Sequence, residues 1–278
     1  MNKKLSIITI NYNNLDGLKR TVESVVNQTW QEFEYIVIDG GSTDGSAAYI
    51  ESQSDKIDYW VSEPDNGIYN AMNKGIAIAK GEYLLFLNSG DHLFSETVLE
   101  ENHSSITNYD LVYFDIQIVD ESGAKTSMYP EKLRFSDLYF KSLPHLGTFI
   151  KRQLFETVGL YDENFKIVSD WKFFIMALFK HNCNYSKRKG ILSTFYMDGI
   201  SAISDYSDER NKVLKENFSE YIIDYEQWNL HQKVLNTNRF KMLSEIEKTF
   251  IGKKTISFIF RTYIILFSKK KLKKILKG

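Results

Sequence analysis

The chain has 278 residues, of which 43% are apolar and 26% are charged, and its formal net charge is −1 at pH 7. These values are typical of a globular protein with one large domain, or with one domain and an appendage. The single cysteine, Cys183, excludes a disulfide within the chain and indicates a reducing compartment. No run of about eighteen uncharged apolar residues occurs, so we expect no full membrane span.

The first ninety residues alternate between two hydrophobic periodicities. Four short stretches, apolar almost throughout, predict strands covered on both faces: Leu5–Ile10, Phe33–Ile38, Asp58–Val61 and Tyr83–Leu87. The first of these is too short for the apolar region of a signal peptide. Apolar residues at helical spacing predict helices over 18–26, after Ser46 and over 68–79. We therefore expect an α/β fold with a mostly parallel, Rossmann-like sheet flanked by helices.

The pattern changes after residue 108. The stretch Tyr109–Val119, followed by DESGAK, predicts a hairpin added to the sheet, and Leu154–Gly159 and Trp171–Phe179 predict short helices. From Asp208 to Lys248 the chain is charged, helical in pattern and free of glycine. We therefore expect a first domain over residues 1–205 and a C-terminal α-helical extension over residues 206–278.

Polar side chains follow each of the four predicted strands at the point where the strand ends. They are Asn11 and Tyr12, Asp39, Asp65, and Asn88 with Asp91. Each loop alone also fits an ordinary turn. Because the carboxyl ends of parallel strands lie at one edge of a sheet, where such folds bind ligands, the four loops together predict a ligand site.

The residue types at this edge suggest a nucleotide and a cation. Asp39 is placed to accept hydrogen bonds from a base or ribose, but DGGSTDG is not the G-x-G-x-x-G pattern of nicotinamide-binding folds. Asp91 offers hard oxygen ligands for a divalent cation that phosphate oxygens also hold. Such a cation would neutralise charge on a diphosphate leaving group. Lys74 either adds a second positive charge or is a solvated surface lysine.

Several segments in order, SIITINYNN, VIDGGSTDGS, SEPDNGIYNAMNKGIAIAKGEYLLFLNSGD and SDWKFF, resemble the family-2 glycosyltransferases, which have the GT-A fold. The resemblance covers about the first 200 residues. It implies transfer of a sugar from a nucleotide diphosphate to an acceptor hydroxyl with inversion, usually with Mn or Mg. It also implies a donor site made of Asn11, Tyr12, Asp39, Asp65, Lys74, Asn88 and Ser89, with Asp91 at the metal.

The segment Asn88-Ser-Gly-Asp91 departs from the pattern of this family. Members usually carry two or three acidic residues there, whereas Asp91 is the only one in this chain. One carboxylate holds Mg weakly without phosphate oxygens. We therefore expect the metal and the nucleotide to bind together.

The resemblance places the catalytic base at Asp170, where it would take the proton of the acceptor hydroxyl. Asp170 or Ser169 also fits a helix N-cap, and the two roles are compatible. His145, in LPHLGTFI, resembles the family's histidine on the acceptor or diphosphate side, although a lone loop histidine is more often structural. Trp171 would stack on a sugar or belong to the core.

The C-terminal tail differs from the rest of the chain in charge. Residues 251–278 contain nine Lys or Arg and no acid, whereas the first 250 residues carry a net charge of −10. The stretch ISFIFRTYIILF projects as an amphipathic helix, and SKKKLKKILK follows it. This pattern predicts docking of 251–278 on an anionic membrane surface. The alternative is a helix packed on the first domain with solvated lysines.

These features lead us to expect a metal-dependent glycosyltransferase that extends a surface polysaccharide or lipopolysaccharide. The family resemblance alone implies UDP-hexose or UDP-HexNAc as the donor. We expect a glycan or lipid-linked molecule as the acceptor, and the cytoplasmic face of the plasma membrane as the location. A sugar nucleotidyltransferase is one alternative, but a Gly-rich basic loop after the first strand is missing. A non-catalytic nucleotide-sugar binding protein is the other, suggested by the thinned acidic segment.

Other classes of chemistry lack their motifs. A G-x-S-x-G elbow and a Walker loop do not occur, which argues against serine hydrolases and P-loop enzymes. One cysteine and five dispersed histidines argue against zinc. Only the basic tail would support nucleic-acid binding, so we expect no nucleic-acid partner.

Overall fold

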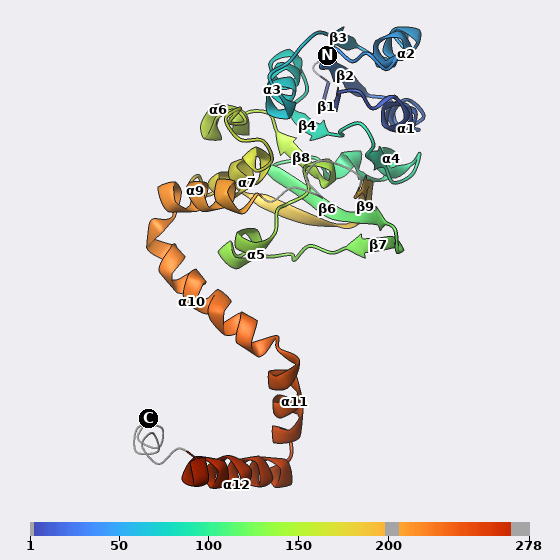
Figure 1. Ribbon diagram of the computed structural model, residues 1–278. Coiled ribbons are helices and arrows are strands. Elements are labelled where there is room, and N and C mark those ends of the chain that lie inside the picture. The colour runs from blue at the N-terminus through green and yellow to red at the C-terminus, as the bar shows by residue number, and fades with distance from the viewer. Residues whose placement is uncertain (1–2, 198–205, 268–278) are drawn as a thin grey trace. The chain divides into compact units, whose positions relative to one another are not determined.

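The computed structural model of the protein describes residues 3–197 and 206–267 (Figure 1). The chain divides into two compact units, Met1–Val213 and Leu214–Gly278. The first unit contains every strand of the described residues, and the second is helical. The division falls inside helix α9 (Ser207–Asn217), so that the first residues of this helix belong to the first unit.

The N-terminal half of the first unit is a parallel sheet with the strand order β3-β2-β1-β4. Its strands are β1 (Leu5–Asn11), β2 (Phe33–Asp39), β3 (Tyr59–Ser62) and β4 (Tyr83–Phe86). The connecting helices are α1 (Leu15–Val26), α2 (Ser46–Ser52) and α3 (Ile68–Ile78). The predicted strands and helices are confirmed, with ends shifted by at most three residues.

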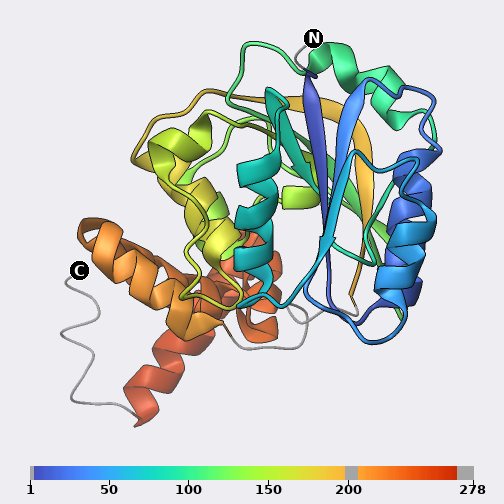
Figure 2. The same cartoon turned by 90° about the horizontal axis from the view of Figure 1, so that it is seen from above.

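Helices cover both faces of these strands (Figures 1 and 2). Helices α1 and α2 lie side by side on one face, and α3 lies on the other. Every residue of β1, β2 and β4 is buried, which explains why apolar residues occupy most positions of these strands rather than every second one.

The C-terminal half of this unit extends the sheet with antiparallel and parallel pairs. Strand β4 pairs with β8 (Thr148–Lys151), β8 with β6 (Leu111–Asp120), β6 with β9 (Tyr185–Tyr196), and β9 with the short β5 (His92–Leu93). Strand β7 (Gly123–Ser127) forms the predicted hairpin with β6. The described sheet is thus mixed: its N-terminal half is parallel, and the strands beyond β4 form antiparallel and parallel pairs. This arrangement is the one that the resemblance to the GT-A fold implies.

Short helices surround this half of the sheet. They are α4 (Val98–Asn102), η1 (His103–Ser105), α5 (Phe135–Phe140), η2 (His145–Gly147), α6 (Leu154–Val158) and α7 (Ser169–Phe179). The two helices predicted over 154–159 and 171–179 are confirmed. The apolar stretch after His145 predicts the strand that the structure shows as β8. Strands β5 and β9 carry no clear strand signal, because β5 is very short and the first half of β9 is rich in Lys and Arg.

The second unit consists of the end of α9 followed by α10 (Ser219–Leu235), α11 (Asn238–Glu247) and α12 (Phe250–Phe267). The C-terminal helices expected from the sequence are therefore present. Many large apolar side chains of these helices are exposed, including Trp228 on α10 and Phe258 on α12. Within residues 3–197 and 206–267, none of the helices is both long and apolar enough to span a bilayer.

Candidate active site

Asn11 connects two of the strand ends that the sequence predicted to meet. Its side-chain amide donates to Asp39 Oδ1 at 2.6 Å, and its Oδ1 accepts a hydrogen bond from the Ser89 hydroxyl. Asp39 ends β2 and Ser89 follows β4, the two strands that flank β1. The edge containing Asp39 and the segment Asn88–Asp91 is therefore continuous, because both parallel neighbours of β1 end beside Asn11.

Asp39 is fully buried and its carboxylate is occupied by protein donors. Ser42 donates to it through its hydroxyl and its backbone N–H, at 2.6 Å and 2.9 Å, and the Ser62 hydroxyl donates at 2.6 Å. Burial works against the charge of Asp39, but the hydrogen bonds from Ser42, Ser62 and Asn11 outweigh it and lower the pKa of the carboxyl. In the structure Asp39 ties the ends of β1, β2 and β3 together, and its contact with a nucleotide stays a prediction.

The side chains of Asp65 and Tyr12 both lie close to Gly40. A Cβ atom at position 40 would come within 2.5 Å of Asp65 Oδ2 and 3.2 Å of the Tyr12 ring, so a side chain there would displace the Asp65 carboxylate. Tyr12 is 67% exposed, which leaves its ring open to a ligand. Lys74, also predicted at the donor site, pairs with Glu63 at 2.7 Å and donates to the Pro64 carbonyl at 3.2 Å.

Two side chains of helix α1 bind the backbone of the segment Asn88–Asp91. Arg20 Nε donates to the Gly90 carbonyl at 2.9 Å, and the Thr21 hydroxyl donates to the Asp91 carbonyl at 2.6 Å. Gly90 has a φ of +109°, a region that side chains other than glycine rarely adopt. Backbone geometry therefore requires glycine at this point of the segment.

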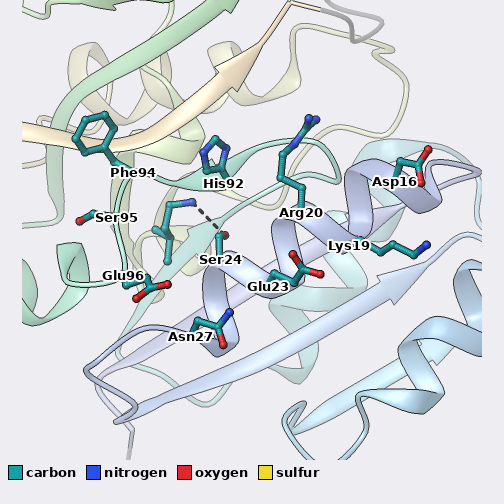
Figure 3. A pocket seen from close by; sticks show the side chains of 11 residues that line it. Asp16, Lys19, Arg20, Glu23, Ser24, Asn27, His92, Phe94, Ser95 and Glu96 are labelled. Atoms are coloured by element: carbon teal, nitrogen blue, oxygen red, sulfur yellow. Dashed lines mark hydrogen bonds between the residues drawn. The ribbon is translucent and has the colours of Figure 1, made fainter.

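A groove of about 500 Å³ adjoins this segment, between α1 and β5 (Figure 3). Charged side chains of α1 line it, among them Lys19 and Arg20, together with His92 and Phe94. The Nδ1 atom of His92 is buried and has no hydrogen-bond partner within the part of the chain that the structure describes. Burial and the neighbouring Arg20 lower the pKa of this histidine. Arg20, which lines the groove, also donates to the Gly90 carbonyl. The groove therefore lies next to the segment Asn88–Asp91.

His145 joins Asp170 to the same segment. Its Nδ1 lies 3.2 Å from Asp170 Oδ2, and its Nε2 lies 3.3 Å from the Asn88 side-chain nitrogen. With a proton on Nδ1, the imidazole donates to Asp170 and accepts from Asn88. Burial disfavours a charge on His145, but the hydrogen bond and charge of Asp170, with the charge of Asp91, outweigh burial and raise the pKa of the ring.

Asp170 is the second residue of α7, and its other oxygen is held as well. Its Oδ1 accepts from the Trp171 N–H at 2.8 Å and from the Tyr69 hydroxyl at 3.2 Å. Burial and the charge of Asp170 raise the pKa of Tyr69, which therefore stays a donor. The Asp170 side chain is nevertheless 17% exposed. An oriented yet accessible carboxylate is the arrangement that a general base requires.

Helix α3 fixes the loop that leads to Asp170. Asn73 pairs with the backbone of Tyr161 in both directions, at 2.9 Å and 3.1 Å, and the Tyr69 hydroxyl shares its single proton between the Ile167 carbonyl and Asp170 Oδ1. The N-cap of α7 is Val168, with no side-chain cap. Asp170 is thus oriented by neighbours that lie far away in sequence.

Trp171 lies in the core of the first unit. It is 3% exposed, its Nε1 donates to the Leu138 carbonyl at 2.6 Å, and Arg210 covers its ring at 4.4 Å. Trp171 is therefore a core residue, which was one of the two expectations for it, and no face of its ring is open to a sugar.

The oxygen atoms of the segment Asn88–Asp91 fit a divalent cation that has further ligands. The buried Oδ1 of Asn88 has no hydrogen-bond partner in the described residues, and the Asp91 carboxylate is near enough to His145 to affect its pKa. Both are hard oxygen donors of the kind that Mg and Mn bind. Among the described residues, no three His, Cys, Asp or Glu side chains gather as a metal site. The fit is therefore to a cation that phosphate oxygens or water also coordinate.

Comparison with known proteins identifies the family. Residues 6–168 match the sequence profile described as Glycosyl transferase family 2. The chain belongs to this family. An uncharacterised glycosyltransferase of Mycobacterium tuberculosis is 36% identical over 178 residues, which cover 62% of this chain and 68% of the relative. A PGL/p-HBAD biosynthesis glycosyltransferase of the same species is 30% identical over 174 residues, which cover 60% and 67%.

Solved structures share the fold of this family member. Staphylococcus aureus TarS 1–349 in complex with UDP-GlcNAc superposes with a TM-score of 0.60 at 22% identity, over 76% of this chain and 64% of that one. Only 43% of the longer TarS chain is covered. The mannosyltransferase PcManGT of Pyrobaculum calidifontis, in complex with GDP-Man and Mn²⁺, gives a TM-score of 0.54 at 12% identity, over 96% and 88%. At such low identity these likenesses establish the fold.

Several residues at the site carried no signal in the sequence. Tyr69 looks like part of a helix face, and Arg20 like a surface residue of α1. Their partners Asp170 and Gly90 are 101 and 70 residues away. Ser62 could have been noticed as one more polar residue at a strand end, beside the predicted Asp65.

Proposed function

We propose that the protein is an inverting glycosyltransferase that transfers a sugar from UDP-hexose or UDP-HexNAc to a hydroxyl group of a glycan or lipid-linked acceptor. The observation that carries this proposal is the chain of contacts from Asp170 through His145 to Asn88, at the edge where β1, β2 and β4 end. It puts a candidate base next to the segment expected at the donor diphosphate. TarS, solved with UDP-GlcNAc, supports the choice of donor.

Asp170 acts as the general base in this proposal. The acceptor oxygen attacks the anomeric carbon of the donor, and its proton passes to Asp170 as the new C–O bond forms. The bond between the anomeric carbon and the diphosphate oxygen breaks, and its electrons leave with the nucleoside diphosphate. His145 and the Trp171 N–H hold the two carboxylate oxygens, so little reorientation is needed in the transition state.

The remaining residues bind the donor and its metal. Asn11, Tyr12, Asp39, Asp65, Lys74 and Ser89 surround the nucleotide and the sugar. Asp91 and Asn88 would hold Mn or Mg together with the diphosphate. The cation would neutralise the charge that develops on the leaving group. PcManGT, which has the same fold and was solved in complex with GDP-Man and Mn²⁺, supports the use of a divalent cation.

A thermal-shift screen of nucleotide sugars, with and without Mn, tests the choice of donor. We expect one UDP-sugar to raise the melting temperature selectively, because a ligand that binds only the folded state stabilises it by mass action. At a concentration of about 100 times Kd the gain is about 2.7 kcal/mol. Uridine is the control for binding through the nucleoside alone. Equal shifts with GDP-sugars and UDP-sugars would contradict the proposed donor.

We also propose that residues 251–278 dock on an anionic membrane surface, where a lipid-linked acceptor would be available. Helix α12 exposes Phe258 at 71%, Ile259 at 51% and Phe260 at 49%, beside the cation Arg261. The segment carries nine Lys or Arg and no acid. Each cation near an anionic surface contributes about 1 kcal/mol to binding.

Co-sedimentation with vesicles tests the membrane proposal. We expect the full chain to bind vesicles containing anionic lipid, and a chain ending at residue 250 to lose this binding. Substituting Lys269, Lys270 and Lys271 by Gln should weaken it, whereas the same substitutions at exposed Lys56, Lys132 and Lys189 should not. Unchanged binding after the truncation would refute the proposal.

A further inference from the structure

The pair His145–Asp170 depends on two segments, and helix α9 binds both. One is the loop of residues 166–168, which leads directly into α7 and Asp170. The other is the C-terminal end of helix α5, residues 138–141, from which the chain continues to His145. Two consecutive residues near the start of α9, Glu209 and Arg210, each bind one of these segments.

Glu209 holds the loop before Asp170 through its backbone. Its Oε1 accepts from the Lys166 N–H at 2.9 Å, and its Oε2 accepts from the N–H groups of Ile167 and Val168 at 3.1 Å and 3.3 Å. Three successive N–H groups that point to one carboxylate form an anion-binding turn. Hydrogen bonds to a charged group are stronger than neutral ones. Since Val168 provides no side-chain cap for α7, Glu209 fixes the start of that helix from outside.

Arg210 binds the C-terminal end of α5, from which the chain continues to His145. Its Nη2 donates to the carbonyls of Leu138, Tyr139 and Lys141 at 2.7, 3.0 and 3.2 Å. Its guanidinium also covers the ring of Trp171, whose Nε1 donates to the same Leu138 carbonyl. Arg210 therefore links the end of α5 to the residue that follows Asp170.

We infer that Glu209 and Arg210 are positioning residues, which set the geometry of the His145–Asp170 pair and thereby the rate of transfer. This inference rests on the proposed function, because it takes Asp170 to be the base. Without Glu209, the segment 166–168 would lose its only side-chain acceptor among the described contacts, and Asp170 would sample more orientations. A displacement of about 1 Å at a reacting group can reduce a rate by about 100-fold.

The test compares Glu209→Ala and Glu209→Gln with Glu216→Ala, which changes an exposed glutamate on the same helix. Two quantities are measured on the full-length protein: kcat with the donor KM, and hydrogen exchange of the amides of residues 166–168. We expect Glu209→Ala to speed exchange at 166–168 and to reduce kcat between about 10-fold and about 100-fold. The donor KM should stay within about twofold, because the donor site is unchanged. Glu209→Gln, which keeps one acceptor oxygen, should restore part of both effects, and Glu216→Ala should change neither.

Each other outcome overturns the inference or isolates its premise. Faster exchange with an unchanged kcat, or a raised donor KM with an unchanged kcat, would show that Glu209 does not position the base. If Glu209→Ala fails to fold, the same two quantities are measured for Glu209→Gln and Arg210→Lys. A reduced kcat with an unchanged donor KM in these variants supports the inference, and an unchanged kcat overturns it. If Asp170→Asn proves fully active, the proposed function fails, whereas the exchange result for Glu209 still reports on the loop.

Discussion

Asp170→Asn is expected to reduce sugar transfer between about 10²-fold and about 10⁴-fold, the range that general-base catalysis contributes. The amide cannot take the acceptor proton at neutral pH. It keeps an oxygen that can accept the Trp171 N–H, and it remains the same size beside His145 and Tyr69. Donor binding, followed by thermal shift, should therefore be retained while kcat falls.

The control for this variant is Asp55→Asn, which makes the same change at an exposed position. It should transfer sugar at the rate of the unchanged protein. An Asp170→Asn protein with undiminished kcat would exclude Asp170 as the base. Donor binding without transfer in the unchanged protein would instead favour the non-catalytic nucleotide-sugar binder.

Asp91→Ala is expected to remove the effect of Mn on donor binding and to reduce transfer by about 10²-fold or more. With this carboxylate gone, the remaining candidate ligand in the segment is the Asn88 side-chain oxygen, which is too weak to hold a cation beside a diphosphate. The backbone contacts of position 91 with Thr21 and Asn88 do not involve the side chain, so the segment should keep its shape.

Chelation provides a second readout of the same site. We expect EDTA to inactivate the unchanged protein and Mn to restore it, while Asp91→Ala should respond to neither. The control Asp55→Ala should behave like the unchanged protein. Full activity of the unchanged protein in EDTA, with a donor shift that does not depend on Mn, would exclude a role for the cation.

The two variants separate the two ends of the reaction. Asp91 lies on the segment after β4, at the expected diphosphate, and Asp170 lies at the start of α7, at the expected acceptor. His145 contacts Asp170 directly, and the charge of Asp91 contributes to the raised pKa of His145. Because the charges of Asp170 and Asp91 both raise the pKa of His145, each of the two variants is expected to lower the pKa of this histidine.

The sequence by itself determined the parallel half of the fold and the edge at which the site lies. Mostly apolar strands such as Leu5–Ile10 and Phe33–Ile38, separated by helical patterns, indicate a sheet covered on both faces. In such a sheet the polar residues after each strand must share an edge. Asn11, Asp39, Asp65 and Asn88 could therefore be assigned to one region from local pattern alone.

Only the tertiary structure decided how that region is completed. The hydrogen bond between His145 and Asp170 joins residues 25 positions apart, and the one between Asn88 and His145 joins residues 57 positions apart. The hydrogen bonds of Glu209 to residues 166–168 join residues 41 to 43 positions apart. The pairing of β5, β8 and β9, and the burial of Trp171 beneath Arg210, also depend on distant segments. Local hydrophobic periodicity records which face of an element is buried, but not which distant side chain it meets, and so these contacts emerge only when the chain is folded.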